Sequence, residues 1–248
     1  MLRSAKSIMG FQLECLDGAL GAVKDLYFHD DVWAIRYVVV DPMPLLPGRN
    51  VLIPPAEMQQ PDWQARSIPV NLTRDQVRNS PSIGTDRPVS RQEEAELHRF
   101  FQWVPYWGPA GTASQPLAVP VENREKTDPT EATRQGDARL RSFQEVSGYG
   151  ISALDGDIGH IEDMILDDGQ WLFQMFVVDT RNWLPGKHVV LDTEWIGRID
   201  HAEKVVVTDL KRDVIKDAPE YRPTDPINEK YKHQLYDYYG RPKNRADR

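Results

Sequence analysis

The chain has 248 residues, which suits one large domain or two small ones. Hydrophobic residues make up 40% of it, enough for a buried core, and 30 Lys and Arg against 38 Asp and Glu give a formal net charge of −8. Because nucleic-acid binding depends on cations that neutralise phosphates, this acidic balance argues against a nucleic-acid partner. The single Cys15 excludes an internal disulfide and a cysteine-based zinc cluster, which fits a reducing compartment.

No run of the sequence approaches the ~20 apolar residues that a membrane-spanning helix needs. The first residues, MLRSAKSIMGFQLE, also lack the apolar core of a signal peptide. We therefore expect a cytoplasmic protein that meets a membrane only through a partner and does not insert into it.

Alternating apolar residues and turn signals predict a series of short strands in the first part of the chain. Phe11, Leu13 and Cys15 alternate with polar residues, as in a half-buried strand, and Asp17-Gly18 predicts a tight turn after it. Further strands are expected at residues 21–28, 33–40, 50–53 and, more weakly, 64–70. Thr73 is then expected to cap a short helix over Arg74–Arg78.

A longer helix is predicted after Ser90, behind an extended, proline-punctuated arm at residues 81–88. Ser90 and Glu93 form an S-x-x-E capping box, which satisfies free N–H groups at the start of a helix. Leu97, Phe100 and Phe101 follow at the spacing i, i+3, i+4 and make one apolar stripe.

The whole pattern recurs 138 residues further along the chain. Residues 33–51, WAIRYVVVDPMPLLPGRNV, align without a gap with residues 171–189, WLFQMFVVDTRNWLPGKHV. The match continues through a second arm into the helix, whose stripe is repeated by Leu235, Tyr238 and Tyr239. Such self-similarity predicts two domains of one design.

We therefore expect a first repeat at residues 1–107 and a second at residues 142–248, each ending in an arm and a helix. Residues 108–141 are rich in Pro, Ala, Thr, Glu and Gln and contain almost no large apolar side chain. That composition predicts a flexible linker. The polar tail from Arg241 is expected to fray.

Three motifs in each repeat resemble the PRC-barrel family, named after the cytoplasmic domain of the photosynthetic reaction-centre H subunit. They read GAVKDLYF, WAIRYVVVD and LPGRNV in the first repeat and GHIEDMIL, WLFQMFVVD and LPGKHV in the second. The resemblance covers roughly residues 10–80 and 148–218. It implies a mainly β fold, with two small antiparallel PRC-type β-barrels of about six strands arranged as an internal duplication.

What the family implies about function is protein docking. In the H subunit the barrel caps the cytoplasmic face of a membrane complex and shapes proton delivery to a quinone. In a ribosome maturation factor the same barrel binds a ribosomal protein. This chain differs from the H subunit, because it carries two barrels and begins without a membrane helix.

The residues that could carry chemistry have a plainer interpretation. Acidic residues gather at the expected turns of both repeats: Asp17, Asp25, Asp30, Asp31, Asp155, Asp163, Asp167 and Asp168. They lack the alternating spacing of a calcium loop, so we interpret them as turn residues. The six histidines form no metal-binding motif and none recurs at the 138-residue spacing. With no nucleophile or phosphate-loop motif, and with Cys15 on the apolar side of a strand, we expect no enzyme, no cofactor and no metal site.

The sharpest candidate for a partner-binding site is the aromatic cluster Phe100, Phe101, Trp103, Tyr106 and Trp107. The interpretation that we favour for this cluster is packing within the chain, either on its own repeat or across to the other, as in a pseudo-dimer.

We expect a non-enzymatic adaptor or assembly factor that binds proteins. Two alternatives remain: an H-subunit-like component of a photosynthetic or electron-transport membrane complex, and a factor associated with ribosome maturation or RNA processing. A further homo-oligomer is left open.

Overall fold

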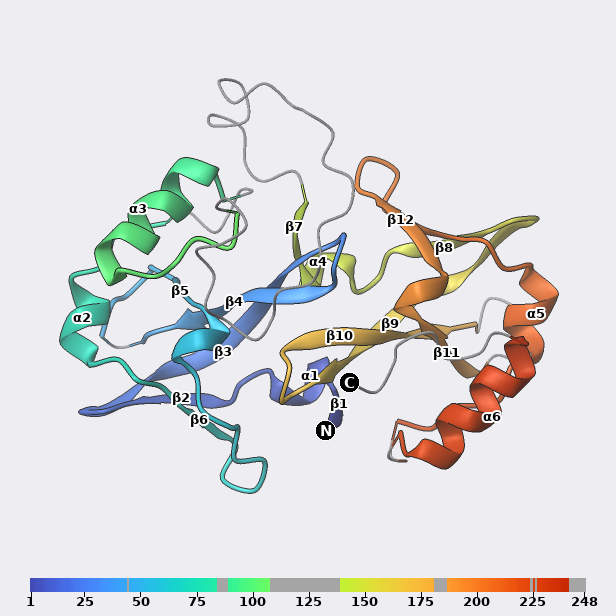
Figure 1. Cartoon of the computed structure of the whole chain (residues 1–248), viewed down its shortest axis with the longest axis horizontal. Helices are drawn as coiled ribbons and strands as arrows, with labels where there is room; N and C mark the ends of the chain where they lie inside the picture. Colours follow the sequence, from blue (N-terminus) through green and yellow to red (C-terminus); the bar gives the residue numbers. More distant parts are fainter. Residues whose placement is uncertain are drawn as a thin grey trace. The chain divides into compact units, whose positions relative to one another are not determined.

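The computed structural model describes residues 1–43, 45–83, 89–107, 139–180, 187–223, 225 and 227–240. Its fold is mainly β, with short helices at the ends of the strand series (Figure 1). The chain divides into two compact units. We call Met9–Ser142 the middle unit, and Met1–Ile8 together with Phe143–Arg248 the split unit.

The middle unit contains an antiparallel series of strands with one parallel addition. Its strands are β2 (Gln12–Cys15), β3 (Gly18–His29), β4 (Ala34–Asp41), β5 (Val51–Ile53), β6 (Ser67–Pro69) and β7 (Leu140–Ser142). Its helices are η1 (Pro55–Glu57), α2 (Arg74–Arg78) and α3 (Arg91–Phe101). The pairing order is β6–β2–β3–β4–β5, where β6 is parallel to β2 and β7 adds to β3.

The split unit combines the first residues of the chain with elements from its second half. Its strands are β1 (Leu2–Ser4), β8 (Gly150–Ala153), β9 (Gly156–Asp167), β10 (Leu172–Asp179), β11 (His188–Asp192), β12 (Ile196–Asp200) and β13 (Val205–Thr208). Its helices are α1 (Ala5–Ile8), α4 (Phe143–Val146), η2 (Thr193–Trp195), α5 (Arg212–Asp217) and α6 (Glu229–Tyr239). The pairing order is β12–β13–β8–β9–β10–β11, with β1 added to β9.

These pairings form an open path in place of the closed barrel that we expected in each repeat. Among the described residues, no pairing joins β5 to β6 or β11 to β12. In the middle unit the cause is local, because Pro54 and Pro55 directly follow β5 and a proline has no N–H to donate to a ladder. In the described stretch between η1 and β6, the pairing is limited to isolated bridges, at Met58–Val70 and Asp62–Ser67.

Several predicted elements are confirmed. The Asp17-Gly18 turn joins β2 to β3, and Thr73 caps α2 with a full capping box. Two boundaries differ from expectation. Residues 1–8, expected in the first repeat, belong to the split unit. Residues 140 and 141, expected in the linker, form β7 together with Ser142, which was expected to begin the second repeat. A three-residue strand has too little sequence pattern to reveal its partner.

Some expectations lie outside the described residues. These are the linker at residues 108–138, the tail from Arg241, the Leu-Pro-Gly motif of the second repeat, and parts of both proline-rich arms.

Trp33 and Trp171 are buried, as their motif predicts, but each stands in the turn before its strand. Their exposed fractions are 8% and 6%, and both have a left-handed backbone, with φ of 59° and 52°. The Trp33 N–H donates to the His29 carbonyl at 2.8 Å, and its ring stacks on Phe28. Tertiary packing therefore holds a large side chain in a backbone conformation that L-residues rarely adopt.

Trp33→Ala should lower the free energy of unfolding by about 3–5 kcal/mol, because a large buried ring leaves a cavity. Urea unfolding of the variant beside Leu16→Ala, whose side chain is 69% exposed, would measure the loss. Equal stabilities of the two variants would contradict the burial of Trp33.

Gly21 and Gly159 allow a close crossing of the chain. A Cβ atom at Gly21 would lie 2.0 Å from the Asp41 carbonyl oxygen, and one at Gly159 would lie 2.1 Å from that of Asp179. Since both obstacles are backbone atoms, a side chain can fit only if β3 and β4, or β9 and β10, move apart.

Gly21→Ala should therefore destabilise the protein by about 2–3 kcal/mol through overpacking. Gly48→Ala is the matched control, because Gly48 has a φ of +74° that favours glycine, but a Cβ atom there would meet no other atom within 4 Å. The control should lose only about 1 kcal/mol. Chemical denaturation of both variants gives the comparison, and an equal loss would rule out the crossing as the cause.

Candidate protein-interaction surface

The position of the aromatic cluster depends on how α3 begins and ends. At its start, the Ser90 hydroxyl accepts from the Glu93 N–H and the Glu93 carboxylate accepts from the Ser90 N–H, at 3.2 and 2.9 Å. At its end, Gln102 has a left-handed φ of 59°, and the Trp103 N–H donates to the His98 carbonyl at 2.8 Å. This ending turns the chain sharply. Trp103 and Tyr106 consequently pack back onto the cluster that α3 covers.

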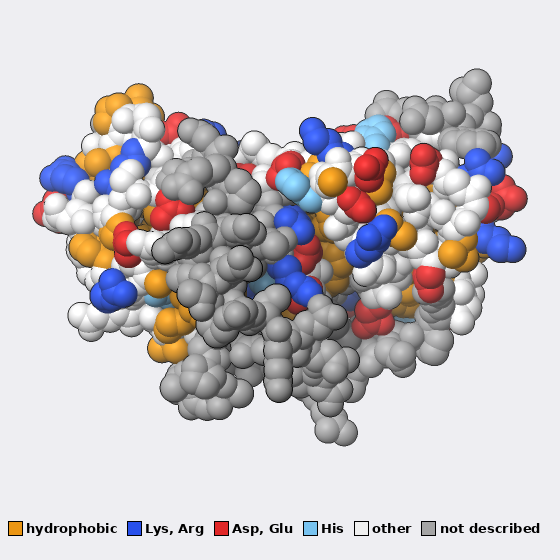
Figure 2. All heavy atoms as spheres, turned by 90° about the horizontal axis from the view of Figure 1, so that it is seen from above, with side chains coloured by type: hydrophobic (Ala, Val, Ile, Leu, Met, Phe, Trp, Pro, Cys, Tyr) orange, Lys and Arg blue, Asp and Glu red, His pale blue; other side chains and the backbone are white. Residues whose placement is uncertain are grey.

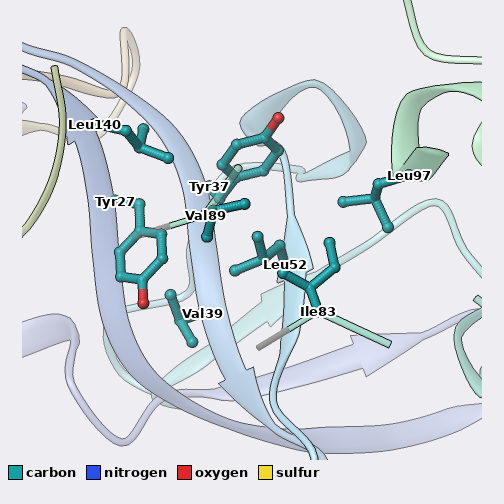
Figure 3. Packing of buried hydrophobic residues seen from close by; sticks show 8 residues of the cluster. All are labelled: Tyr27, Tyr37, Val39, Leu52, Ile83, Val89, Leu97 and Leu140. Carbon is teal, nitrogen blue, oxygen red and sulfur yellow. The ribbon is translucent and has the colours of Figure 1, made fainter. Parts of the chain in front are cut away.

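Of the predicted apolar stripe of α3, Leu97 and Phe101 pack within the middle unit, whereas Phe100 is 42% exposed. Leu97 is buried in a cluster with residues from β3, β4, β5 and β7, as Figure 3 shows. The cluster consists of Tyr27, Tyr37, Val39, Leu52, Ile83, Val89, Leu97 and Leu140. The helix α3 thus packs on strands of the middle unit.

A buried polar network joins α3 to β4 beneath this stripe. The Tyr37 hydroxyl donates to Glu94 Oε1 at 2.9 Å and lies 2.8 Å from His98 Nε2. Tyr37 and Glu94 are fully buried, and His98 is 5% exposed. A buried carboxylate is stable only when donors or cations surround it, so the network fixes the helix at a definite place on β4.

Tyr106 and Arg91 complete the environment of the Glu94 carboxylate. The Tyr106 hydroxyl donates to Oε1 at 2.7 Å, and Arg91 Nη1 lies 3.0 Å from Oε2. The Arg91 guanidinium also stands 4.4 Å from the ring centre of Trp107. One carboxylate thereby anchors residues from both sides of the turn at Gln102.

Burial shifts the pKa values inside the network. Desolvation, with a further contribution from Arg91, lowers the pKa of His98 to about 4. Desolvation and the neighbouring Glu94 carboxylate raise the pKa of Tyr37 well above its usual value. Both side chains are consequently neutral near pH 7.

The structure brings the five predicted aromatic residues together at the end of α3. Phe101 and Trp103 stack with ring centres 4.2 Å apart, and Trp103 Nε1 donates to Glu57 at 2.6 Å. Phe101, Trp103, Tyr106 and Trp107 are half-buried. Phe100 is 42% exposed and Val104 is 45% exposed. We call the five aromatic residues together with Val104 the α3 surface.

The network does not recur in the split unit, although the helix does. The positions of Tyr37, Glu94 and His98 are taken there by Met175, Lys232 and Tyr236. The Tyr236 hydroxyl instead donates to the Asp192 carboxylate, and its ring lies against Trp195. The polar contacts that hold α3 on its strands therefore differ from those that hold α6.

An acid, a phenol and an imidazole in contact resemble catalytic machinery, but this group is closed to substrates. A general base must come within hydrogen-bonding reach of a substrate proton. Glu94 has no exposed surface, and its two oxygen atoms already face Tyr37, Tyr106 and Arg91. The contacts of this group hold α3 in place on β4.

Sequence patterns missed two groups of side chains that could hold a metal ion. His29, Asp30 and Asp31 form one, and His160, Glu162 and Asp179 form the other, with ligand atoms within 4.8 Å in each. Protein cations already contact both groups: Arg141 and Arg139 pair with Asp30 and Asp31, and Lys6 pairs with Glu162. We assign no metal to either group.

Charges of both signs are interspersed on the face drawn in Figure 2. Its described side chains form no continuous basic field of the kind that binds a phosphate backbone. Within the described parts of the chain, no helix has the length and apolarity to cross a bilayer.

Comparison with known proteins leaves the chain without an assigned family. No protein-family model matches it, and no curated protein matches its sequence.

The low pKa of His98 predicts a loss of stability in acid. His98 stays neutral in the folded protein down to a pKa of about 4 but takes up a proton near pH 6.5 when unfolded. The unfolded state therefore binds more protons between these values, and the free energy of unfolding should fall by about 3 kcal/mol as pH drops through this window.

Urea unfolding at several pH values between 7.5 and 4.5 would measure this slope. His98→Gln should flatten it, whereas His160→Gln, at a side chain that is 39% exposed, should leave it unchanged. Identical slopes for all three proteins would show that His98 does not titrate in this way.

Proposed function

We propose that this protein is a non-enzymatic adaptor that binds a protein partner through the α3 surface of its middle unit. The observation that carries the proposal is the combination of exposed and fixed apolar side chains at the end of α3. Phe100 and Val104 are open to solvent, while Trp103, Tyr106 and Trp107 beneath them are held by hydrogen bonds and cation–π contacts. Interfaces draw most of their binding energy from such anchored aromatic residues.

The asymmetry between the units supports the choice of surface. The Phe100-Phe101 pair recurs as Tyr238-Tyr239, but the positions of Trp103, Tyr106 and Trp107 hold Arg241, Asn244 and Arg245. A feature shared by both repeats is explained by the fold. The aromatic extension belongs to one repeat alone and therefore points to recognition.

We further propose that the two units are related PRC-type modules produced by duplication. In support, β3 and β9 have the same length, and corresponding strands and helices follow each other at the same spacing. The segment His188–Asp200 also changes partners at η2, with β11 paired to β10 and β12 paired to β13. One continuous segment therefore supplies β11 and β12, the first and last strands in the pairing order of the split unit. A strand at the corner of a barrel changes partners in the same way.

The proposal is tested by placing a photo-crosslinking amino acid at Phe100 in cells of the source organism. Leu154, which is 66% exposed in the split unit, is the matched control position. A partner crosslinked from Phe100 alone should bind the purified protein, and Phe100→Ala should weaken that binding about tenfold or more, as at an interface hot spot. Leu154→Ala should bind normally.

Crosslinks of equal yield and identity from both positions would overturn the choice of surface. The identity of a specific partner separates the remaining alternatives. A subunit of a photosynthetic or electron-transport complex would favour the H-subunit-like role, and a ribosomal protein would favour a role in ribosome maturation.

A further inference from the structure

Each unit completes its longest strand with a short strand from a distant part of the chain. β4 pairs with β3 along Ala22–His29 and occupies one edge, while β2 covers the other edge only at Gly18–Ala22. Further along the same edge, β7 pairs with Tyr27–His29. In the split unit, β1 covers the corresponding edge of β9 at Ile165–Asp167.

The origin of these two short strands is reciprocal. β1 precedes the middle unit in the chain but belongs to the split unit. β7 leads directly into Phe143, the first residue of the larger part of the split unit, but belongs to the middle unit. Each unit thus takes the strand that leads into the other repeat.

The two added strands are identical in sequence and register. Leu-Arg-Ser is the sequence of both β1 and β7. Leu2 pairs with Asp167 and Leu140 pairs with His29, and these partners occupy equivalent positions 138 residues apart.

A serine and a buried aspartate lock each strand in place. The Ser142 hydroxyl donates to Asp25 Oδ2 at 2.5 Å, and the Ser4 hydroxyl makes the same bond to Asp163 Oδ2. Asp25 and Asp163 are each 8% exposed. Their other oxygen accepts the N–H of the next residue, at 2.8 Å in both units. The serine hydroxyl is therefore a donor to a carboxylate that water hardly reaches.

An arginine and a second aspartate add an ion pair at the neighbouring position. Arg141 Nε lies 2.8 Å from Asp30 Oδ2. Arg3 Nε lies 3.7 Å from Asp168 Oδ2, and the N-terminal ammonium of Met1 lies closer, 2.5 Å from Asp168 Oδ1. Asp168 is only 2% exposed, so water screens these pairs weakly. Sequence, backbone pairing and the serine–aspartate hydrogen bond agree between the two places, and an arginine lies beside the second aspartate in both.

We propose that the edges of β3 and β9 are equivalent strand-accepting sites for the segment Leu-Arg-Ser, and that a second copy of this chain can supply the segment. Strand addition to an open edge is a common recognition mode, in which backbone bonds give affinity and side-chain pockets give specificity. Here the serine of the segment donates a hydrogen bond to Asp25 or Asp163, and its arginine pairs with Asp30 or Asp168.

A second copy fits these sites because it carries the same segment with the same donors. Exchanging an identical element between copies makes no new type of contact, so the exchanged state differs little in energy from the single chain. The product is a dimer in which β1 of each copy lies on β9 of the other. This inference is independent of the α3 surface and of any partner bound there.

Charge exchange in the full-length chain tests the proposal. In the Arg3→Glu chain the segment no longer suits Asp168, and in the Asp168→Arg chain the site no longer suits Arg3. Each segment matches the site of the other chain. An equimolar mixture should therefore contain about ten times more dimer, at twice the 28.5 kDa of the chain, than either variant alone.

The double variant R3E/D168R is the control, because its segment and site match within one chain. It should remain monomeric and be more stable than D168R alone, although both chains lack the ion pair between the Met1 ammonium and Asp168. A monomeric mixture together with such a stabilised double variant would overturn exchange between copies. A double variant no more stable than D168R alone would overturn the arginine–aspartate pair as the contact that guides the segment.

Two further designs keep the test decisive if Asp168→Arg does not fold. The pair Arg141→Glu and Asp30→Arg repeats the same exchange at β3, where the two side chains are 16% and 12% exposed. Chains carrying L2C or D167C, in a Cys15→Ala background, can also be mixed and oxidised. A disulfide between residues 2 and 167 of different copies is expected, and its absence under conditions where the chain bearing both substitutions crosslinks internally would overturn the proposal.

Discussion

The structure depends on a carboxylate buried at the same place in each unit. Asp25 and Asp163 lie inside long strands, where an ionised group is costly unless donors reach it. The strand supplies one donor through its own backbone, and the serine of β7 or β1 supplies another. This requirement explains why β1, at the start of the chain, pairs with β9, and why β7, just before the second repeat, pairs with β3.

The same interaction shows where local sequence patterns fail. We interpreted Asp25 and Asp163 as turn residues, because aspartate is favoured in turns, and the structure corrects this by placing them within β3 and β9. Their role depends on serines 117 and 159 residues away in the chain. By contrast, Asp17 and Asp155 do lie at turns and accept the first N–H groups of α2 and α5.

Features governed by nearby residues were predictable. The Ser90–Glu93 capping box, the Thr73 cap and the burial of Leu97 all follow from residues within a few positions of each other. The aromatic candidates were also visible in the sequence. Their support was not, because Glu94 looks like an ordinary acidic residue in the first turn of a helix until Tyr37 from a distant strand meets it. The open strand path of the middle unit was missed although Pro54 and Pro55 are visible in the sequence, because the family resemblance implied a closed barrel.

The polar network beneath α3 would favour binding at the proposed α3 surface. A partner that docks on mobile side chains must order them and loses free energy in doing so. Here Trp103, Tyr106 and Trp107 are already fixed by Glu57, Glu94 and Arg91. The Glu94 and His98 positions carry Lys232 and Tyr236 on α6, so that helix must be held by different contacts. If the two units arose by duplication, as we propose, a preorganised apolar surface on one of them indicates that this unit specialised.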